Sequence, residues 1–163
     1  METRSKEFVA LGHAGSEHYA GLESFENPGV SHVVMRSDEL VAVCPVTGQP
    51  DMYVASIEFW PQGLCLESKS LKLYLSRYRN EGHFCEALAV AIRDDVAEAL
   101  ELSPDKVKVT LRQKARGGIT IVASTASRAV NISTGAHTPA ERRRRQVSKP
   151  SIPGSMTSST TAS

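Results

Sequence analysis

Cys44 is the first residue whose surroundings in the sequence point to chemistry. It opens a loop rich in Pro and Gly, with the sequence CPVTGQPD, and Asp51 closes that loop seven residues later. Because the segments on both sides resemble strands, we expect the loop to bring the thiol and the carboxylate to one edge of a sheet. A thiolate that attacks an electrophile and a carboxyl group that delivers a proton would form a catalytic pair. A buried structural cysteine is the alternative.

A second group of polar residues opens residues 67–79, which begin with the sequence ESKSLK. Lys69 and Lys72 are three residues apart and therefore share a helical face. Ser68 and Ser70 fall in the first turn, where backbone N–H groups lack intrahelical partners. The pattern is typical of a phosphate site at a helix N terminus. An ordinary capped helix with a solvated lysine face is the alternative.

Two further positions carry groups suited to binding. Glu86 follows Phe84 in the first turn of the next expected helix, where its carboxylate could accept N–H bonds from a guanine-like edge. Arg116 precedes Gly117-Gly118 in an expected hairpin loop, a position suited to an anionic ligand. The alternatives are a solvated acid near a helix N terminus and an exposed hairpin arginine.

The elements expected to position these residues are two strand pairs that flank two helices. Alternation and β-branched content predict strands at 31–43 (broken near Ser37-Asp38), 52–60, 106–112 and 119–125. Apolar residues at helical spacing predict helices over 67–79 and from about 84 to 100. Leu64-Cys65-Leu66 is expected to extend the pairing of the second strand. The order β-β-α-α-β-β predicts an α+β domain, an antiparallel four-stranded sheet with two helices on one face.

The sequence divides into three segments. Residues 1–30 are expected to form an irregular N-terminal arm with a turn at Asn27-Pro28-Gly29, and residues 31–125 the catalytic domain. Residues 126–163 are rich in Ser and Thr, carry an excess of five positive charges and are predicted to be a disordered basic tail. Nucleic acid or phosphate contacts of the tail arginines are the alternative to a solvated tail.

Composition excludes several classes of protein. The 163 residues carry a net charge of +1, and no apolar run has the length of a membrane span or signal peptide. Cys44, Cys65 and Cys85 have neither disulfide-like nor metal-ligand spacing, so we expect a reduced, cytoplasmic protein without a metal site. No glycine-rich nucleotide-binding motif is present. No membrane partner and no direct nucleic acid partner are predicted.

Together these segments resemble the 7-cyano-7-deazaguanine reductases, the QueF nitrile reductase family of queuosine biosynthesis, a tRNA modification. The similarity covers about residues 10–125, in the family's order and spacing. The matching stretches are Leu22 to Phe25, Cys44 to Asp51, Glu67 to Leu75, Arg79-Asn80, Phe84 to Glu86 and Arg116 to Gly118. The stretch ESKSLKLY is the family signature of NADPH-using enzymes, and CPVTGQPD is nearly as specific.

The resemblance implies a tunnelling fold whose copies close into a ring-based homo-oligomer with active sites at the interfaces. It implies that Cys44 adds to the nitrile carbon to give a thioimide, that Asp51 donates protons, and that two NADPH molecules supply hydride. The implied substrate-binding residues are Leu66, Glu67, Ser68, Cys85 and Glu86. The implied cofactor-binding residues are Ser68, Lys69, Lys72, Arg116 and Gly117.

One position departs from the family pattern. Many members have histidine immediately before the glutamate, where this sequence has Cys85, a smaller residue and a poorer hydrogen-bond donor. Two alternatives to the reductase also stay open. One is an amidine-forming relative that acts on nitrile-bearing tRNA. The other is a non-catalytic purine- or pterin-binding protein of the same fold, whose Arg-rich tail recruits a partner.

Overall fold

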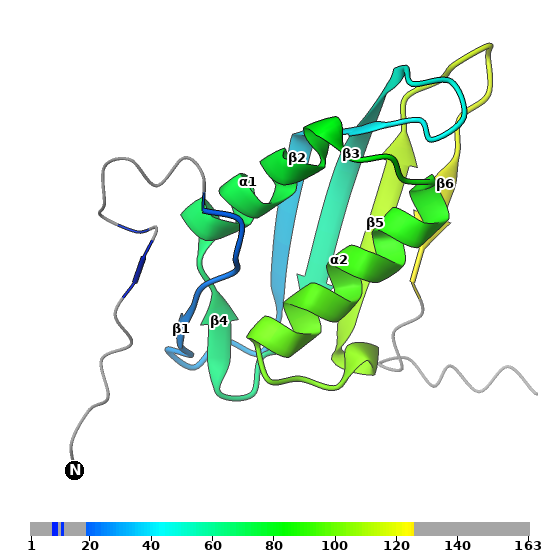
Figure 1. Ribbon diagram of the computed structural model, residues 1–163. Coiled ribbons are helices and arrows are strands. Elements are labelled where there is room, and N and C mark those ends of the chain that lie inside the picture. The colour runs from blue at the N-terminus through cyan, green and yellow to red at the C-terminus, as the bar shows by residue number, and fades with distance from the viewer. Residues whose placement is uncertain (1–7, 10, 12–18, 126–163) are drawn as a thin grey trace, which may run out of the picture. The chain divides into compact units, whose positions relative to one another are not determined.

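The computed structural model describes residues 8–9, 11 and 19–125, and the tail predicted at 126–163 lies outside them. An antiparallel sheet with the order β2-β3-β5-β6 carries both helices on one face (Figure 1). The elements of this layered unit are β2 Val33–Val43, β3 Pro50–Phe59, α1 Ser68–Ser76, α2 Cys85–Ala99, β5 Val107–Gln113 and β6 Val122–Ser124. The predicted α+β architecture is confirmed. Among the described residues, no helix is long and apolar enough to cross a membrane.

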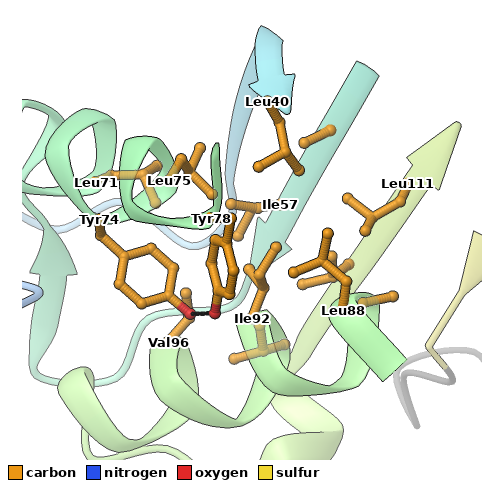
Figure 2. Close-up of a cluster of buried hydrophobic side chains, with 14 of the residues drawn as sticks. Leu40, Ile57, Leu71, Tyr74, Leu75, Tyr78, Leu88, Ile92, Val96 and Leu111 are labelled. Atoms are coloured by element: carbon orange, nitrogen blue, oxygen red, sulfur yellow. Dashed lines mark hydrogen bonds between the residues drawn. The ribbon is translucent and has the colours of Figure 1, made fainter. Parts of the chain in front are cut away.

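The core lies between the sheet and the two helices. Alternate residues of β3 and β5 point toward the helices because successive side chains of a strand face opposite sides. Both helices turn an apolar face toward these strands, as the spacing predicted. Figure 2 shows where the two layers meet, with labelled side chains Leu40, Ile57, Leu71, Tyr74, Leu75, Tyr78, Leu88, Ile92, Val96 and Leu111. The outward face of the sheet keeps partly exposed apolar residues, among them Val34 and Val54.

The pairing of residues 64–66 differs from the prediction. β4 (Leu64–Leu66) does not extend β3 but pairs with β1 (Ser24–Glu26) in a separate two-stranded sheet. The Asn27 N–H also donates to the Gly63 carbonyl at 2.9 Å, which ties the turn before β4 to the segment after β1. The segment predicted as irregular therefore contains a strand. The predicted turn at 27–29 is confirmed, since Asn27 Oδ1 accepts from the Gly29 N–H at 3.0 Å.

Two strand boundaries also differ from the predictions. β3 begins at Pro50, because Pro50 and Asp51 already pair with Val43 and Ala42 of β2, so Asp51 lies within the strand. β6 spans only Val122–Ser124, because the chain before it is used in the turn of the β5–β6 hairpin. The break predicted in the first strand is confirmed as a register shift between Ser37 and Leu40.

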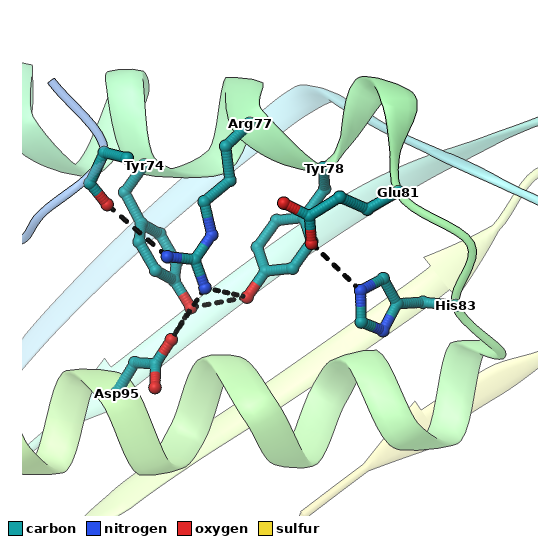
Figure 3. Close-up of polar contacts among 7 residues, drawn as sticks. Tyr74, Arg77, Tyr78, Glu81, His83 and Asp95 are labelled. Atoms are coloured by element: carbon teal, nitrogen blue, oxygen red, sulfur yellow. Dashed lines mark hydrogen bonds and ion pairs between the residues drawn. The ribbon is translucent and has the colours of Figure 1, made fainter. Parts of the chain in front are cut away.

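A polar cluster joins the two helices through a short 3-10 helix, η2 (Arg77–Asn80), that continues α1. The Tyr74 hydroxyl donates to Asp95 of α2 at 2.6 Å and contacts the Tyr78 hydroxyl at 2.7 Å. Arg77 donates to Asp95 at 3.0 Å and lies over the Tyr74 ring, 4.3 Å from its centroid (Figure 3). The cluster fixes α1 and η2 against α2, and thereby fixes the segment that leads into the start of α2.

Candidate active site

Two loops lie side by side at one edge of the main sheet, and α2 begins near them (Figure 1). The β2–β3 loop carries Cys44 and leads to Asp51, and the β5–β6 loop carries Arg116. The Arg116 guanidinium forms an ion pair with the Asp51 carboxylate and donates to Gln49 Oε1 at 3.0 Å. The predicted approach of the thiol and carboxylate ends of the loop is therefore accompanied by a cation from the second loop.

The backbone around Cys44 is held on both sides. The Cys44 N–H donates to the Gln49 carbonyl at 2.8 Å, and the Gly48 N–H donates to the Cys44 carbonyl at 2.9 Å. Gly48 has a φ of 69°, a left-handed conformation that glycine adopts without steric cost. The neighbouring Val43 exchanges two backbone hydrogen bonds with residues 81–83, the segment between η2 and α2. These contacts set the position of the thiol before any ligand binds.

The loop also activates the Cys44 thiol. Hydrogen bonds from the Thr47 hydroxyl, then from the backbone N–H groups of Thr47 and Val46, lower the pKa of Cys44 to about 7. Burial and the Asp51 charge oppose this shift and are outweighed. Burial instead raises the pKa values of the other two thiols, Cys65 and Cys85. Near neutral pH a substantial share of Cys44 is therefore thiolate, the form that attacks electrophiles.

A test of this activation is alkylation of the full chain by iodoacetamide at a series of pH values, with each cysteine followed by peptide mass spectrometry. The Cys44 rate should rise through a midpoint near pH 7, because only the thiolate reacts. Thr47→Val removes the hydroxyl hydrogen bond that lowers the Cys44 pKa most and should move the midpoint upward. Cys65 and Cys85 serve as internal controls, since both are buried and should react slowly at pH 7. A Cys44 midpoint near 9 in the unmodified chain would contradict the assignment.

Arg116 occupies the predicted hairpin turn. Arg116 and Ile119 exchange two backbone hydrogen bonds of 3.1 Å, and the two residues between them have positive φ values, 57° at Gly117 and 80° at Gly118. Such a turn requires residues that tolerate φ > 0, and glycine does so at least cost. The contact of Arg116 with Asp51 was not predicted, because nothing in the sequence places the two loops side by side.

The start of α2 presents two neighbouring side chains in opposite directions. Cys85 is buried, and its thiol lies 4.0 Å from the Leu111 carbonyl of β5. Glu86 is exposed in the first turn, as predicted, and Phe84 before it is 57% exposed. Glu86 is thus free to accept hydrogen bonds from a ligand, whereas Cys85 packs beneath the surface.

The remaining predicted substrate residues gather at the start of α1. Glu67 is buried and caps the helix, since its two carboxylate oxygens accept from the N–H groups of Lys69 and Ser70, both at 2.7 Å. The Glu23 N–H donates to Ser70 Oγ at 2.9 Å, and Leu66 pairs with β1, so the chain before β1 closes over this helix start. Leu66, Glu67, Ser68 and Lys69 therefore form one local cluster.

This α1 cluster and the Cys44 loop are not brought together within one copy of the chain. α1 and η2 lie between them in the chain, and the backbone hydrogen bonds beside the loop join Val43 to residues 81–83, which follow η2. Nine α-helical and four 3-10 residues span about 20 Å. A ligand the size of a purine base cannot touch both groups of residues in the same copy.

A groove of ≈ 360 Å³ runs between the irregular part of β2 and the exposed side of α1. Its lining residues are Met35, Arg36, Ser37, Asp38, Glu39, Ser68, Leu71, Lys72, Leu75, Ser76 and Arg79. Arg36 and Arg79 join the predicted Lys72 there, and neither was predicted as a binding residue. Arg79 lies seven residues after Lys72, a spacing that returns to the same helical face and could have indicated it. No sequence pattern singles out Arg36.

Comparisons with known proteins all point to one family. The family model described as QueF-like protein matches residues 50–131, about half of the chain. The NADPH-dependent 7-cyano-7-deazaguanine reductase of Frankia casuarinae is 43% identical over 120 residues, which cover 72% of this chain and 94% of that protein. The protein of the same name from Syntrophus aciditrophicus is 48% identical over 103 residues, which cover 61% and 72%.

A solved structure matches as well. The apo crystal structure of the archaeosine synthase QueF-Like superposes with a TM-score of 0.57 at 27% identity, covering 63% of this chain and 98% of that one. The tunnelling fold implied by the sequence resemblance is confirmed. From the family match, the coverage of the relatives and the shared fold, we conclude that this chain belongs to the QueF family.

Proposed function

We propose that the chain reduces the nitrile of 7-cyano-7-deazaguanine to the aminomethyl group of 7-aminomethyl-7-deazaguanine with NADPH, in queuosine biosynthesis. The observation that carries the proposal is the Cys44 thiol, whose pKa is lowered to about 7, in the loop that leads to the Asp51 carboxylate. The relatives named above are NADPH-dependent reductases of this nitrile. An activated thiol at neutral pH, in the reduced state of the cytoplasm, is what addition to a nitrile requires.

In the first step, Cys44 sulfur bonds to the nitrile carbon and one C–N π pair moves to nitrogen. The proton lost by the thiol passes through Asp51 to that nitrogen, which gives a thioimide. NADPH, when held by the residues proposed below, would supply the two hydrides that this carbon takes up, one in each of two rounds. Between the rounds the C–S bond breaks and Cys44 leaves as thiolate. Two hydrides and two protons in total convert the nitrile to an amine, and Asp51 is the proposed source of the protons.

For substrate binding we propose Leu66, Glu67, Ser68, Cys85 and Glu86. The exposed Glu86 carboxylate would accept N–H bonds from the base, and the buried Glu67 and Cys85 would support the site from beneath. For the cofactor we propose Ser68, Lys69, Lys72, Arg116 and Gly117. The groove beside α1 suits an anionic cofactor, because its three cations, Arg36, Lys72 and Arg79, outnumber its two carboxylates, Asp38 and Glu39, and serine hydroxyls and an apolar floor complete the lining. Arg36 and Arg79 therefore join the proposed set.

We also propose that copies of the chain associate into a ring, so that the α1 cluster of one copy faces the Cys44 loop of the next. The separation of about 20 Å within one copy supports this arrangement. So do the apolar residues exposed on the outward face of the sheet, Val34, Met52, Val54 and Val122. Sedimentation should give a mass several times 17.6 kDa. An active monomer would contradict the arrangement.

The function is tested by mixing the chain with 7-cyano-7-deazaguanine. Without NADPH, intact mass spectrometry should show an increase equal to the mass of the base. With NADPH, the adduct should turn over, and two NADPH should be oxidised for each aminomethyl product. Base binding with neither adduct nor turnover would contradict the reductase and leave a binding protein.

An amidine-forming activity is the second candidate, because a solved structure similar to this chain is that of the archaeosine synthase QueF-Like. The stretch ESKSLKLY favours the reductase. Adduct formation without NADPH oxidation, followed by release on addition of an amine, would favour the second candidate instead.

A further inference from the structure

Tyr53 carries a buried hydroxyl that the proposed mechanism does not yet use. The side chain is 0% exposed and lies two residues after Asp51 on the helix-facing side of β3. Among the residues that the structure describes, Tyr53 Oη has no hydrogen-bond partner. Buried polar groups in proteins are nearly always paired, so an unpaired one calls for an explanation.

The fold itself gains nothing from this hydroxyl. An unpaired buried donor is a net cost to stability. A phenylalanine would fill the same space without that cost. Tyr74, another buried tyrosine of the core, is different, because its hydroxyl is bonded to both Tyr78 and Asp95. The Tyr53 hydroxyl is thus available to a partner that is presented in another state of the site.

The groups around the hydroxyl are those of the candidate active site. Burial is the largest cause that raises the pKa of Tyr53. The charges of Asp51, Cys85, Cys44 and Glu86 raise it further, and Asp51 contributes the most of these four. The phenol therefore stays neutral and keeps its proton at physiological pH. Cys85 is a weak donor, and its thiol is directed at the Leu111 carbonyl. It therefore cannot supply the hydrogen bond that the Tyr53 hydroxyl could donate within this site.

The proposed reaction favours a different hydrogen-bond partner for Asp51 than the one it has in the ligand-free chain. In the ligand-free chain Arg116 holds its Oδ1 atom, and the Arg116 side chain is 34% exposed on a glycine turn. A carboxyl group that must pass on a proton works better beside a neutral hydroxyl than in an ion pair with a guanidinium. Tyr53 is the neutral donor on the same face of the same strand.

We propose that Tyr53 is a positioning residue whose hydroxyl bonds the Asp51 carboxyl once Arg116 releases it. The bond holds the carboxyl between Cys44 and the substrate nitrogen. Tyr53 neither gains nor loses a proton in this role. The inference rests on the proposed nitrile reduction, because it assigns Tyr53 to the proton-transfer step of that reaction.

The test is Tyr53→Phe in the full chain, measured as the rate of thioimide formation by rapid-quench mass spectrometry without NADPH. The rate should fall by about 10- to 100-fold, while the Kd for the base and the thermal midpoint stay unchanged or the midpoint rises. Tyr74→Phe is the matched control, since it removes a paired hydroxyl. Its midpoint should fall by about 3 °C with the thioimide rate unchanged.

A double-mutant cycle with Asp51→Asn separates positioning from a general structural role. Tyr53→Phe should slow the reaction no further when Asp51 is already Asn, because the two residues act as one unit. An additive effect, a wild-type rate in Tyr53→Phe, or a loss confined to base affinity would each overturn the inference. Absence of any adduct in the unmodified chain would instead overturn the proposed function, so the two failures are distinguishable.

Discussion

Replacement of Cys44 by alanine should abolish both the covalent adduct with 7-cyano-7-deazaguanine and NADPH oxidation. The thiol is the group that bonds the nitrile carbon, and neither Asp51 nor Arg116 offers a nucleophile that could replace it. Loss of a covalent nucleophile lowers turnover by at least about 10⁴-fold. The measurement is intact mass without NADPH, followed by NADPH consumption with the same preparation. Base affinity should change little, since the thiol is a minor part of the binding surface.

The matched control is Cys65→Ala, which removes a thiol of the same type from β4. Cys65 is buried, its pKa is raised by burial, and its sulfur lies 3.6 Å from Asn27 Oδ1. It belongs to the small sheet and not to the Cys44 loop, so adduct formation should persist. If Cys44→Ala kept the adduct and Cys65→Ala lost it, the nucleophile would be Cys65, and the assignment to Cys44 would be wrong.

Asp51→Asn should have the next largest effect. The amide keeps the shape of the side chain and can still accept from Arg116, but it cannot carry a proton between the thiol and the nitrile nitrogen. Thioimide formation should slow by about 10²- to 10⁴-fold, the usual contribution of a positioned acid or base. The rate is followed by rapid-quench mass spectrometry, with base affinity measured in parallel.

Glu58→Gln is a suitable control for this change. Glu58 lies on the same strand as Asp51, and its carboxylate accepts from Lys108 at 3.4 Å. The substitution removes one paired carboxylate from β3 without touching the loop edge. The reaction rate should be unaffected. A wild-type rate in Asp51→Asn would mean that the thiol proton reaches the nitrile by another route, such as solvent.

The elements around the site could largely be predicted from the sequence, because their signals are local. Alternation in residues 52–60 and 106–112, and helical spacing around Leu71 and Leu88, each depend only on near neighbours. The pairing of Leu64–Leu66 could not be predicted. Three residues carry too little pattern to select a partner, and that partner lay in a segment with weak periodicity.

In the candidate site, too, contacts within a short stretch of sequence could be predicted, whereas contacts between distant segments could not. Cys44 opens the short loop between β2 and β3, and Asp51 lies at the start of β3 directly after it, so their proximity followed from the local sequence. The Asp51–Arg116 ion pair joins residues in two different hairpins and depends on the order of strands in the sheet. The alternation in residues 52–60 indicates that Tyr53 shares one face with Ala55 and Ile57, but only the structure shows that its hydroxyl has no partner among the described residues.

The strand order has a consequence for how the site assembles during folding. The β2–β3 hairpin that contains Cys44 and Asp51 is local and can close early. The central pairing of β3 with β5 places Tyr53 opposite Gln113, and both helices lie between these two residues in the sequence. Contacts between residues so far apart in the chain form slowly. Arg116 reaches Asp51 only after that pairing is made. We therefore expect the nucleophile loop to exist in a folding chain before the cation that restrains its carboxylate arrives.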